Sequence, residues 1–340
     1  MRTSDFFYEL PPEHIAQRPA KPRDSSRLLV YQRSTGKIQH KIFRDLPALL
    51  NPEDALVLNE TRVIPARLHA QKVPTGGKAE ILLLRRLAPQ TWEAMVGGRG
   101  LKPGRRMQVI GGPEAEILED AGRSRRVIQF SAPLTPQLDQ VGEMPLPPYI
   151  HTPLERAEQY QTIFATTPGS SAAPTAGLHF TSELLEKIKA KGVQVIKVTL
   201  HVGLDTFAPV TEDDPTQHQI HTEWCQVSSQ AASHLNQVHA NGGRIITVGT
   251  TSTRTLETSA QVAPTGERVT EFEGSTDLFI LPGYQFKATD AMITNFHLPR
   301  STLLMMISAF AGREEVLKLY TIAMQNNYRF YSFGDAMLLL

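Results

Sequence analysis

The pattern of apolar and polar positions changes twice along the chain and divides it into three zones. Up to about residue 62, two short apolar runs at 28–31 and 55–58 predict buried strands. From about residue 63 to 149, short strand-like runs follow one another between Gly and Pro positions. These runs are 64–70, 79–87, 92–96, 106–110, 115–118 and 126–130. Short strands at this spacing predict an all-β unit, either a small closed barrel or a sandwich.

Beyond about residue 150, helical patterns alternate with strands. Thr181 is a predicted N-cap for a helix that Gly192 ends, and Ser301 is a predicted N-cap for an apolar helix at 303–310. A further helix is predicted at 229–240. Strands are predicted at 193–200, 244–248 and 278–281. Such alternation is typical of an α/β sheet with helices on its faces.

The three zones combine into two predicted domains. Residues 1–62 are too few to bury a core, so their strands need a sheet elsewhere in the chain. The predicted fold is therefore an α/β main domain, a mixed sheet with flanking helices formed by residues 1–62 and 150–340. An all-β barrel domain, residues 63–149, is inserted into it. The Pro-rich segment 144–149 reads as a stiff linker between them.

Composition narrows the class of protein. The chain has 340 residues, of which 41% are hydrophobic, enough for one large core or two ordinary ones. It contains no apolar run of about 18 residues that would span a membrane, and its start lacks the pattern of a signal peptide. The single cysteine, Cys225, excludes an internal disulfide and is expected to be a packed thiol. We expect a cytoplasmic protein.

The charged residues are unevenly distributed along the chain, although the net charge is small. The net charge is +1, but the window from Glu60 to Phe130 holds 13 Arg or Lys against 7 Asp or Glu. A basic module of this kind is able to hold a phosphate backbone. A solvated basic face is an equal alternative on charge alone.

Four segments group hydroxyl, His and Arg side chains in a way that core packing does not require: 169–180, 199–203, 249–254 and 294–301. Segments 169–180 and 249–254 lie at the starts of predicted helices, whose N-termini favour anions such as a carboxylate. His201 follows a predicted strand, where the ligand crevice of an α/β sheet lies, and is either a base or a buried structural histidine.

Other signals are weak or absent. His218, His221 and Glu223 have a spacing that a metal could use, but without cysteine support we predict no metal site and favour acid–base roles for His221 and Glu223. The chain has no GxGxxG loop after a strand, no GxxxxGK[ST] loop and no GxSxG elbow. The absence of these motifs argues against a dehydrogenase, a P-loop NTPase or an α/β-hydrolase.

Eight segments together resemble one family, the S-adenosylmethionine:tRNA ribosyltransferase-isomerases of queuosine biosynthesis. They are 23–29, 59–68, 145–150, 173–181, 199–203, 248–257, 294–299 and 328–336. The resemblance runs in order along nearly the whole chain. It implies a two-domain fold, S-adenosylmethionine as co-substrate, no metal, and a tRNA partner with a modified wobble guanine. It also implies conversion of 7-aminomethyl-7-deazaguanine into epoxyqueuosine, with release of adenine and methionine.

This chemistry requires a base for a C5′ hydrogen of S-adenosylmethionine and partners for its carboxylate and sulfonium. Our catalytic candidates are His179, His201, His221 and His297, followed by Glu223 and Asp290. Our substrate-binding candidates are Arg23, Asp24, Arg27, Asn59, Thr61, Arg62, Thr175, Phe180, Thr250, Thr251, Arg254 and Asn295. For the tRNA backbone we expect contacts from Arg62, Arg67, Arg99, Lys102, Arg105 and Arg106.

Two rival functions remain open at this point. A conventional S-adenosylmethionine methyltransferase would share the cofactor, but it should have a Gly-rich loop after its first strand, which the sequence lacks. A non-catalytic RNA-binding protein would need only the β module, and would have no use for the polar loops beyond residue 150. We expect a monomer, because no exposed heptad or amphipathic dimer stripe is present.

Overall fold

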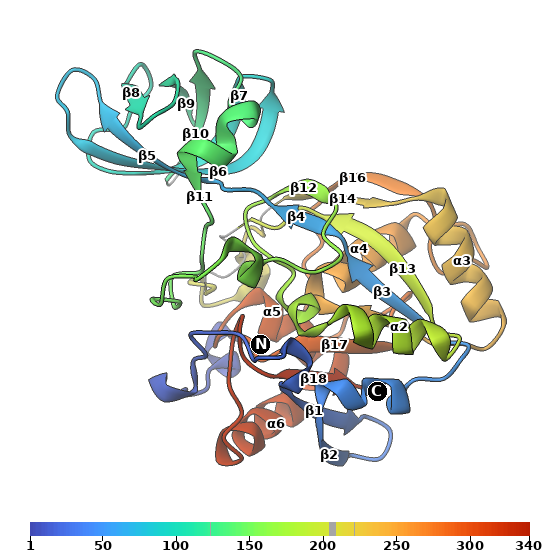
Figure 1. The fold of residues 1–340 in the computed structure, drawn as a ribbon. Helices are drawn as coiled ribbons and strands as arrows, with labels where there is room; N and C mark the ends of the chain where they lie inside the picture. The colour runs from blue at the N-terminus through green and yellow to red at the C-terminus, as the bar shows by residue number, and fades with distance from the viewer. Residues whose placement is uncertain (123, 204–208, 221) are drawn as a thin grey trace.

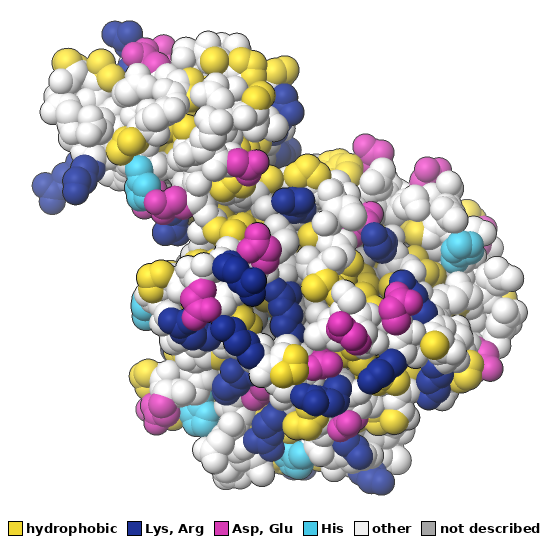
Figure 2. Space-filling model, in the orientation of Figure 1, with side chains coloured by type: hydrophobic (Ala, Val, Ile, Leu, Met, Phe, Trp, Pro, Cys, Tyr) yellow, Lys and Arg dark blue, Asp and Glu magenta, His cyan; other side chains and the backbone are white. Residues whose placement is uncertain are grey.

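A computed structural model describes residues 1–122, 124–203, 209–220 and 222–340. The chain forms a large α/β body and a smaller all-β lobe (Figure 1). A narrow neck joins the two (Figure 2). The predicted fold class is confirmed.

In the described residues the body holds a nine-stranded mixed sheet with the order β16-β14-β13-β3-β15-β17-β18-β1-β2. The strands are β1 Arg27–Gln32, β2 Lys37–Ile42, β3 Ala55–Asn59, β13 Gln194–Leu200, β14 Glu223–Val227, β15 Ile245–Val248, β16 Phe272–Thr276, β17 Ala291–Asn295 and β18 Ala336–Leu339. Strand β3 lies between β13 and β15 and parallel to both, while β1 pairs with β18. The N-terminal strands thus join the C-terminal sheet, as the sequence predicts.

Helices cover this sheet. They are α2 Ser182–Ala190, α3 Ser229–Ala240, α4 Gly249–Gln261, α5 Thr302–Ala311 and α6 Arg313–Gln325. Shorter turns are η1 Thr3–Phe6, η2 Pro12–His14, η3 Arg23–Ser25, η4 Phe43–Leu49, η5 Thr135–Gln137, α1 Leu138–Val141, η6 Ala157–Tyr160, η7 Thr175–His179 and η9 Pro215–Gln217. Both predicted caps are present: Thr181 Oγ1 accepts from the amide of Leu184, and Ser301 Oγ accepts from that of Leu304.

Some elements differ from the sequence prediction. The strand predicted at 278–281 is wrong, because the strand is β16, residues 272–276, which pairs with β14. Residues 278–281 instead form a loop whose Leu278 carbonyl accepts a hydrogen bond from Arg254. Strands β2, β14, β17 and β18 and helix α6 were not predicted. Buried strands such as β17 and β18 do not alternate polar and apolar positions, so they lack a period-two signal.

The all-β lobe is a barrel with the strand order β11-β5-β6-β7-β10-β9-β8, closed by pairing of β5 with β8. Its strands are β5 Arg67–Lys72, β6 Lys78–Ala88, β7 Thr91–Gly97, β8 Arg106–Val109, β9 Glu114–Asp120, β10 Arg125–Phe130 and β11 Gly142–Glu143. Between barrel and body, β4 Thr61–Val63 pairs in parallel with β12 Thr167–Ser170. We propose domain limits at 62/63 and 149/150, since every strand of the barrel sheet falls between them.

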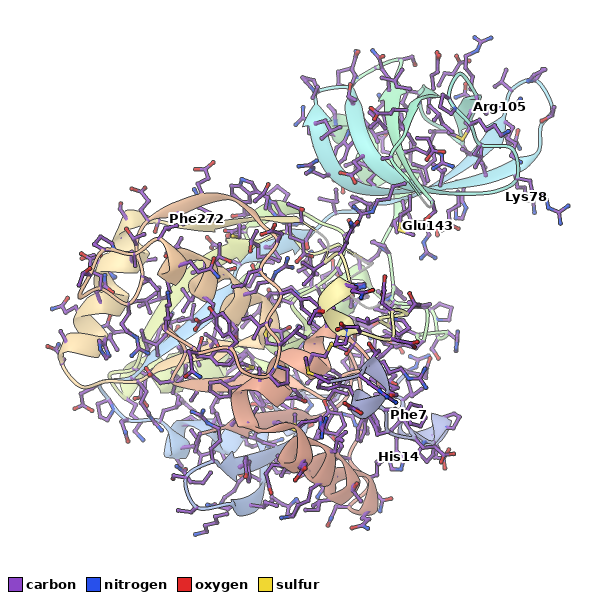
Figure 3. All side chains as sticks on the ribbon, turned by 180° about the vertical axis from the view of Figure 1, so that it is seen from behind. Phe7, His14, Lys78, Arg105, Glu143 and Phe272 are labelled. Carbon is purple, nitrogen blue, oxygen red and sulfur yellow. The ribbon has the colours of Figure 1, made fainter. Side chains whose placement is uncertain are left out.

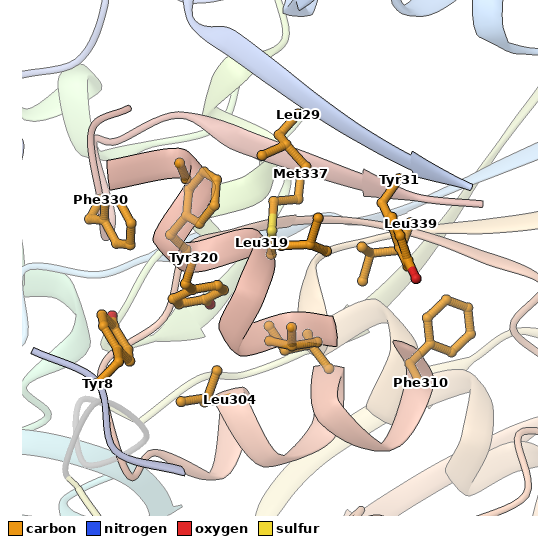
Figure 4. Packing of buried hydrophobic residues seen from close by; sticks show 14 of the residues in the cluster. Tyr8, Leu29, Tyr31, Leu304, Phe310, Leu319, Tyr320, Phe330, Met337 and Leu339 are labelled. Carbon is orange, nitrogen blue, oxygen red and sulfur yellow. The ribbon is translucent and has the colours of Figure 1, made fainter. Parts of the chain in front are cut away.

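Each face of the body sheet has its own core, and alternate residues of β1 enter both. Leu29 and Tyr31 pack with α5 and α6 in a cluster that contains Leu304 and Tyr320 (Figure 4). Leu28 and Val30 face the opposite cluster with α2. The barrel has a separate core that includes Leu68, Trp92 and Phe130. A sheet buried on both faces leaves its strand ends as the place for polar chemistry.

Candidate functional site

Most of the predicted site residues gather at one edge of the body sheet. Strands β3, β13, β15 and β17 run parallel, so Asn59, His201, Thr250 and Asn295 all lie at or just beyond their carboxyl ends. Glu223 joins them because β14 runs antiparallel to β13 and begins at this edge. This edge is where an α/β sheet holds its ligands.

His201 is oriented by contacts on several sides. Its Nδ1 lies 2.8 Å from Thr61 Oγ1, and its ring stacks on Trp224 with a centroid distance of 5.1 Å. Nε2 has no hydrogen-bond partner among the described residues. Burial lowers the pKa of His201 to about 4, so the imidazole is neutral at pH 7. In the tautomer in which Nδ1 donates to Thr61 Oγ1, Nε2 carries the lone pair and is able to act as a base.

Gly169 makes room for this ring. A Cβ added there would lie 2.7 Å from His201 Nε2 and from Cε1, closer than atoms can approach. Its φ of +152° is also a conformation that side chains rarely adopt. The histidine therefore occupies a slot between the indole of Trp224 and the bare backbone of Gly169.

Asn59 sets the backbone of this region rather than facing a ligand. Its side-chain amide donates to the Leu200 carbonyl at 3.0 Å, and its Oδ1 accepts from the amides of Leu200 and Thr61, each at 3.1 Å. These bonds tie the end of β3 to the end of β13. They place Thr61, a predicted substrate-binding residue, within hydrogen-bond reach of His201, a predicted catalytic residue.

Glu223 and Arg254 form a buried ion pair, with Nη1 and Oε2 2.5 Å apart. Arg254 also donates to the carbonyls of Leu278 and Thr276, each at 3.0 Å, and Glu223 accepts from the Gly203 amide. The predicted role of Arg254 as a partner for a substrate carboxylate is therefore not what the geometry favours. The guanidinium holds Glu223 and the chain beyond β16 in place.

A small recess, here called the inner pocket, opens at the same edge. It is lined by Thr175, Thr250, Thr251, Asn295 and His297, among others. Its cavity volume is about 30 Å³, so it admits a small group only. Thr251 Oγ1 is buried without a hydrogen-bond partner in the described residues, and the first turn of α4 has no side-chain cap. Both leave donors available for an anionic group.

His179 lies behind the inner pocket and has both ring nitrogens engaged. Nδ1 is 2.7 Å from Ser26 Oγ, and Nε2 is 3.2 Å from the Asn295 Nδ2. Since this amide nitrogen also donates to the Tyr331 carbonyl, Nε2 accepts and Nδ1 carries the proton. Burial, with the charges of Arg329 and Arg23, lowers the pKa of His179 to about 3. His179 therefore orients Asn295, whose Oδ1 accepts from Thr175 at 3.0 Å.

His297 is also neutral at pH 7, because burial lowers its pKa to about 3. Its Nε2 lies 2.7 Å from Thr294 Oγ1, and its backbone is held by Tyr320 and Tyr8. The edge thus carries three histidines that are all uncharged at neutral pH, of which His179 and His297 are buried and His201 is partly buried.

Other predicted site residues lie elsewhere. Asp290 sits at the opposite edge of the sheet, before β17, where it binds the Ile245 amide and Arg268, so we remove it from the site. Phe180 is fully buried and packs edge-on against Phe43. His221 lies outside the described residues.

Three further predicted residues make ties within the fold. Arg23 donates to the carbonyls of Gln161 and Glu158, and burial lowers the pKa of its guanidinium. Asp24 lies near the hydroxyl of Thr181, and Arg27 covers the ring of Tyr328. Arg62 is exposed on β4.

A larger cleft, here called the interdomain cleft, lies between barrel and body and has a volume of about 570 Å³. Its body wall includes His201, Gly203, Glu223 and Trp224. Val202 lines the inner pocket, so the segment 201–203 separates the two recesses. The cleft is large enough for a nucleoside, and His201 lies at the boundary between cleft and pocket.

Sequence reasoning missed several lining residues. Trp224 lines the interdomain cleft but belongs to none of the eight segments, and Tyr149, Tyr331 and Ser332 line the inner pocket from two of these segments without a predicted role. No pattern in the sequence marks them, because they reach the site through tertiary packing. Cys225 is fully buried, and burial raises the pKa of its thiol to about 12, as expected of a packed thiol.

In the described part of the chain, no group of three His, Cys, Asp or Glu side chains is placed to hold a metal ion. None of the helices that the structure describes is both long and apolar enough to cross a bilayer.

Comparisons with known proteins identify the family of the chain. A family model described as "Queuosine biosynthesis protein" matches residues 3–339. A protein of Symbiobacterium thermophilum named S-adenosylmethionine:tRNA ribosyltransferase-isomerase is 52% identical over 344 residues, covering 100% of both chains. One of the same name from Desulforamulus reducens is 49% identical over 349 residues, again covering 100% of both.

Among solved structures, the crystal structure of S-adenosylmethionine tRNA ribosyltransferase from Thermotoga maritima is similar. It is 41% identical, with a TM-score of 0.58 over 99% of this chain and 100% of that one. The expected resemblance is confirmed over almost every residue, and the chain belongs to the queuosine biosynthesis family of S-adenosylmethionine:tRNA ribosyltransferase-isomerases.

Proposed function

We propose that the protein transfers and isomerises the ribosyl group of S-adenosylmethionine onto 7-aminomethyl-7-deazaguanine at the wobble position of tRNA. The products are epoxyqueuosine in the tRNA, adenine and methionine. The observation that carries the proposal is the placement of His201, a neutral and oriented imidazole at the boundary between a nucleoside-sized cleft and a small anion-favouring pocket.

The inner pocket, with a volume of about 30 Å³, fits the carboxylate of the co-substrate's methionine end. The open first turn of α4 and the free hydroxyl of Thr251 are donors for a carboxylate, a role that Arg254 cannot fill while it holds Glu223. Thr250, Thr175 and Asn295 line the same recess. The adenosyl group and the modified base then occupy the interdomain cleft.

The electrostatics of the edge fit a sulfonium ion. His179, His201 and His297 are all neutral at pH 7, because burial holds their pKa values at about 3, 4 and 3. A cationic substrate therefore meets no unpaired positive charge from these side chains. The sulfonium acidifies the adjacent C5′ hydrogens, and His201 is our candidate for the base that removes one of them.

His179 and Asn59 support this reaction by holding other site residues in place. His179 orients the Asn295 amide that lines the inner pocket, and Asn59 holds Thr61 and His201 in register. The reaction as proposed uses S-adenosylmethionine as co-substrate and no metal. We further propose that the enzyme is a cytoplasmic monomer, acting where mature tRNA is available.

The test is to incubate the protein with S-adenosylmethionine and a tRNA that carries 7-aminomethyl-7-deazaguanine, and to quantify adenine and the digested nucleosides. We expect adenine and epoxyqueuosine in equal amounts. His201→Gln should reduce the rate by at least about a hundredfold, whereas His234→Gln, an exposed histidine on α3, should not change it. Formation of S-adenosylhomocysteine would identify a methyltransferase, and tight tRNA binding without turnover would leave only an RNA-binding role.

A further inference from the structure

The barrel contributes a cationic wall to the interdomain cleft. Arg85 and Arg86 of β6 and Arg125 of β10 line the cleft opposite His201 and Trp224. Arg85 and Arg86 are exposed, so their guanidinium groups are open to solvent and to a ligand. Their neighbours along β6, Leu84 and Leu87, line the cleft as well.

Glu93 of β7 organises this wall. One carboxylate oxygen lies 3.3 Å from Arg85 Nη2 and the other 3.2 Å from Arg125 Nη1, so one acidic group spaces two guanidinium groups. The second carboxylate of the cleft, Glu223, is already paired with Arg254 inside the body. The cleft therefore keeps an excess of positive charge on its barrel side.

Apolar and aromatic groups accompany the charge. Trp224 of the body, which is partly exposed, lines the cleft together with the three arginines, while Trp92 and Leu138 of the barrel lie buried beneath it. Positive charge for a backbone beside aromatic surface for bases is the combination that single-stranded nucleic acids require. A small organic anion would be bound by one or two of these positive charges and would not need a row of three.

We propose that Arg85, Arg86 and Arg125 form a phosphate-binding wall for the tRNA backbone next to the wobble nucleotide. This inference rests on the proposed function and adds the surface that receives the RNA. It differs from the sequence expectation of Arg62, Arg67, Arg99, Lys102, Arg105 and Arg106, none of which lines the cleft. Arg105 lies at the end of the barrel far from the body (Figure 3).

A matched control exists in the same barrel. Arg106 pairs with Glu114 at 3.3 Å, just as Arg85 pairs with Glu93 at 3.3 Å, and both arginines are about half exposed. Arg85→Ala and Arg106→Ala therefore remove the same kind of surface ion pair. Only the first removes a group that lines the cleft.

The experiment measures tRNA affinity by fluorescence anisotropy between 50 and 300 mM salt for the wild-type protein and for Arg85→Ala, Arg86→Ala, Arg86→Lys and Arg106→Ala. For each cleft arginine removed, we expect affinity at about 0.1 M salt to fall about five- to eightfold and the slope of log K against log salt to become shallower by about 0.7 to 0.9. Arg86→Lys keeps the charge and should restore the slope. Arg106→Ala should match the wild type.

Turnover separates this inference from the proposed function. The cleft variants should raise KM for tRNA and leave the rate at saturating tRNA nearly unchanged. Unaltered affinity and slope in Arg85→Ala and Arg86→Ala, in a wild-type protein that forms epoxyqueuosine, would overturn the phosphate wall alone. A wild-type protein that binds tRNA with the expected slopes but releases no adenine would instead overturn the function.

Discussion

At the scale of single residues, the site depends on side chains whose burial changes their chemistry. His179, His201 and His297 have hydrogen-bond partners, but these partners are neutral hydroxyl or amide groups, not carboxylates. Desolvation therefore dominates and favours the uncharged ring. The same residues that prepare the site for a cationic substrate make the fold sensitive to acid.

The acid sensitivity has a definite sign. The folded-state pKa values of His179 and His297, about 3, lie below the value of 6.5 in the unfolded chain, so the unfolded state binds more protons between these limits. The free energy of unfolding should fall as the pH drops from 6.5 towards 3, by up to about 1.4 kcal/mol per pH unit for each histidine. Denaturation by urea at pH 7, 6 and 5 measures it.

His179→Gln removes one of these groups and should flatten the pH dependence, whereas the exposed His234→Gln should not. Equal pH slopes for wild type and His179→Gln would show that His179 titrates normally in the folded state.

Gly169 gives a second prediction at this scale. In Gly169→Ala the new methyl group would lie 2.7 Å from the His201 ring, so the imidazole must leave its slot beside Trp224. A displacement of about 1 Å from productive geometry reduces rates by about a hundredfold. We expect such a loss in the rate of adenine release at saturating substrates, with tRNA affinity preserved.

The control for this substitution is Gly97→Ala on β7. There a Cβ would meet only ordinary contact, 3.6 Å from Glu80 Cβ. Activity close to wild type in Gly169→Ala would show that the ring position is not needed for the reaction.

At the scale of elements, one buried ion pair connects three parts of the sheet edge. Arg254 of α4 holds Glu223 at the start of β14 and the carbonyls of Thr276 and Leu278 at the end of β16. Because Glu223 in turn accepts from the Gly203 amide, the pair fixes the segment that separates the inner pocket from the interdomain cleft. The pair is thus structural support for the site.

Removing one partner should be costly because it leaves the other charge buried. We expect Arg254→Met to lower the free energy of unfolding by about 3–5 kcal/mol. The double variant Arg254→Met, Glu223→Gln should recover part of that loss, since no buried charge remains unpaired. Chemical denaturation of the wild type, both single variants and the double variant measures the coupling. Additive effects of the two substitutions would rule out this role.

At the scale of the whole molecule, the barrel and the body have separate cores. Leu68, Trp92 and Phe130 belong to a cluster made only of residues between 64 and 141, and none of the body clusters contains them. The two lobes meet at the neck and across the interdomain cleft. A substrate bound in the cleft contacts both.

Because the two lobes have separate cores, a destabilising substitution in one core should destabilise only that lobe. Ile117 is fully buried in the barrel, and Ile117→Ala should destabilise that lobe by about 2–5 kcal/mol. Amide hydrogen exchange should accelerate in β6, β7, β9 and β10 but not in β3 and β15 of the body. Parallel acceleration in both lobes would mean that the chain unfolds as a single unit.

The class of fold and the family could be predicted from the amino-acid sequence alone, together with candidate segments for the site. Period-two strands with Gly and Pro between them predicted the barrel, and capping residues such as Thr181 and Ser301 marked helix starts, because these signals are local. The resemblance along eight segments pointed to the family. The strand wrongly predicted at 278–281 shows the limit, since an apolar run does not reveal whether a neighbouring strand is there to pair with it.

The contacts of each polar residue follow only from the three-dimensional fold. Arg254 resembled a ligand for an anion until Glu223, 31 residues away, was found beside it, and Asp290 proved to lie at the other edge of the sheet. Burial gives the site histidines lower pKa values than surface histidines have. The cleft arginines differ from the other basic residues of the barrel because they face the body across the interdomain cleft. Burial, partner geometry and the sharing of a cleft depend on contacts between residues far apart in the chain, and no local pattern encodes them.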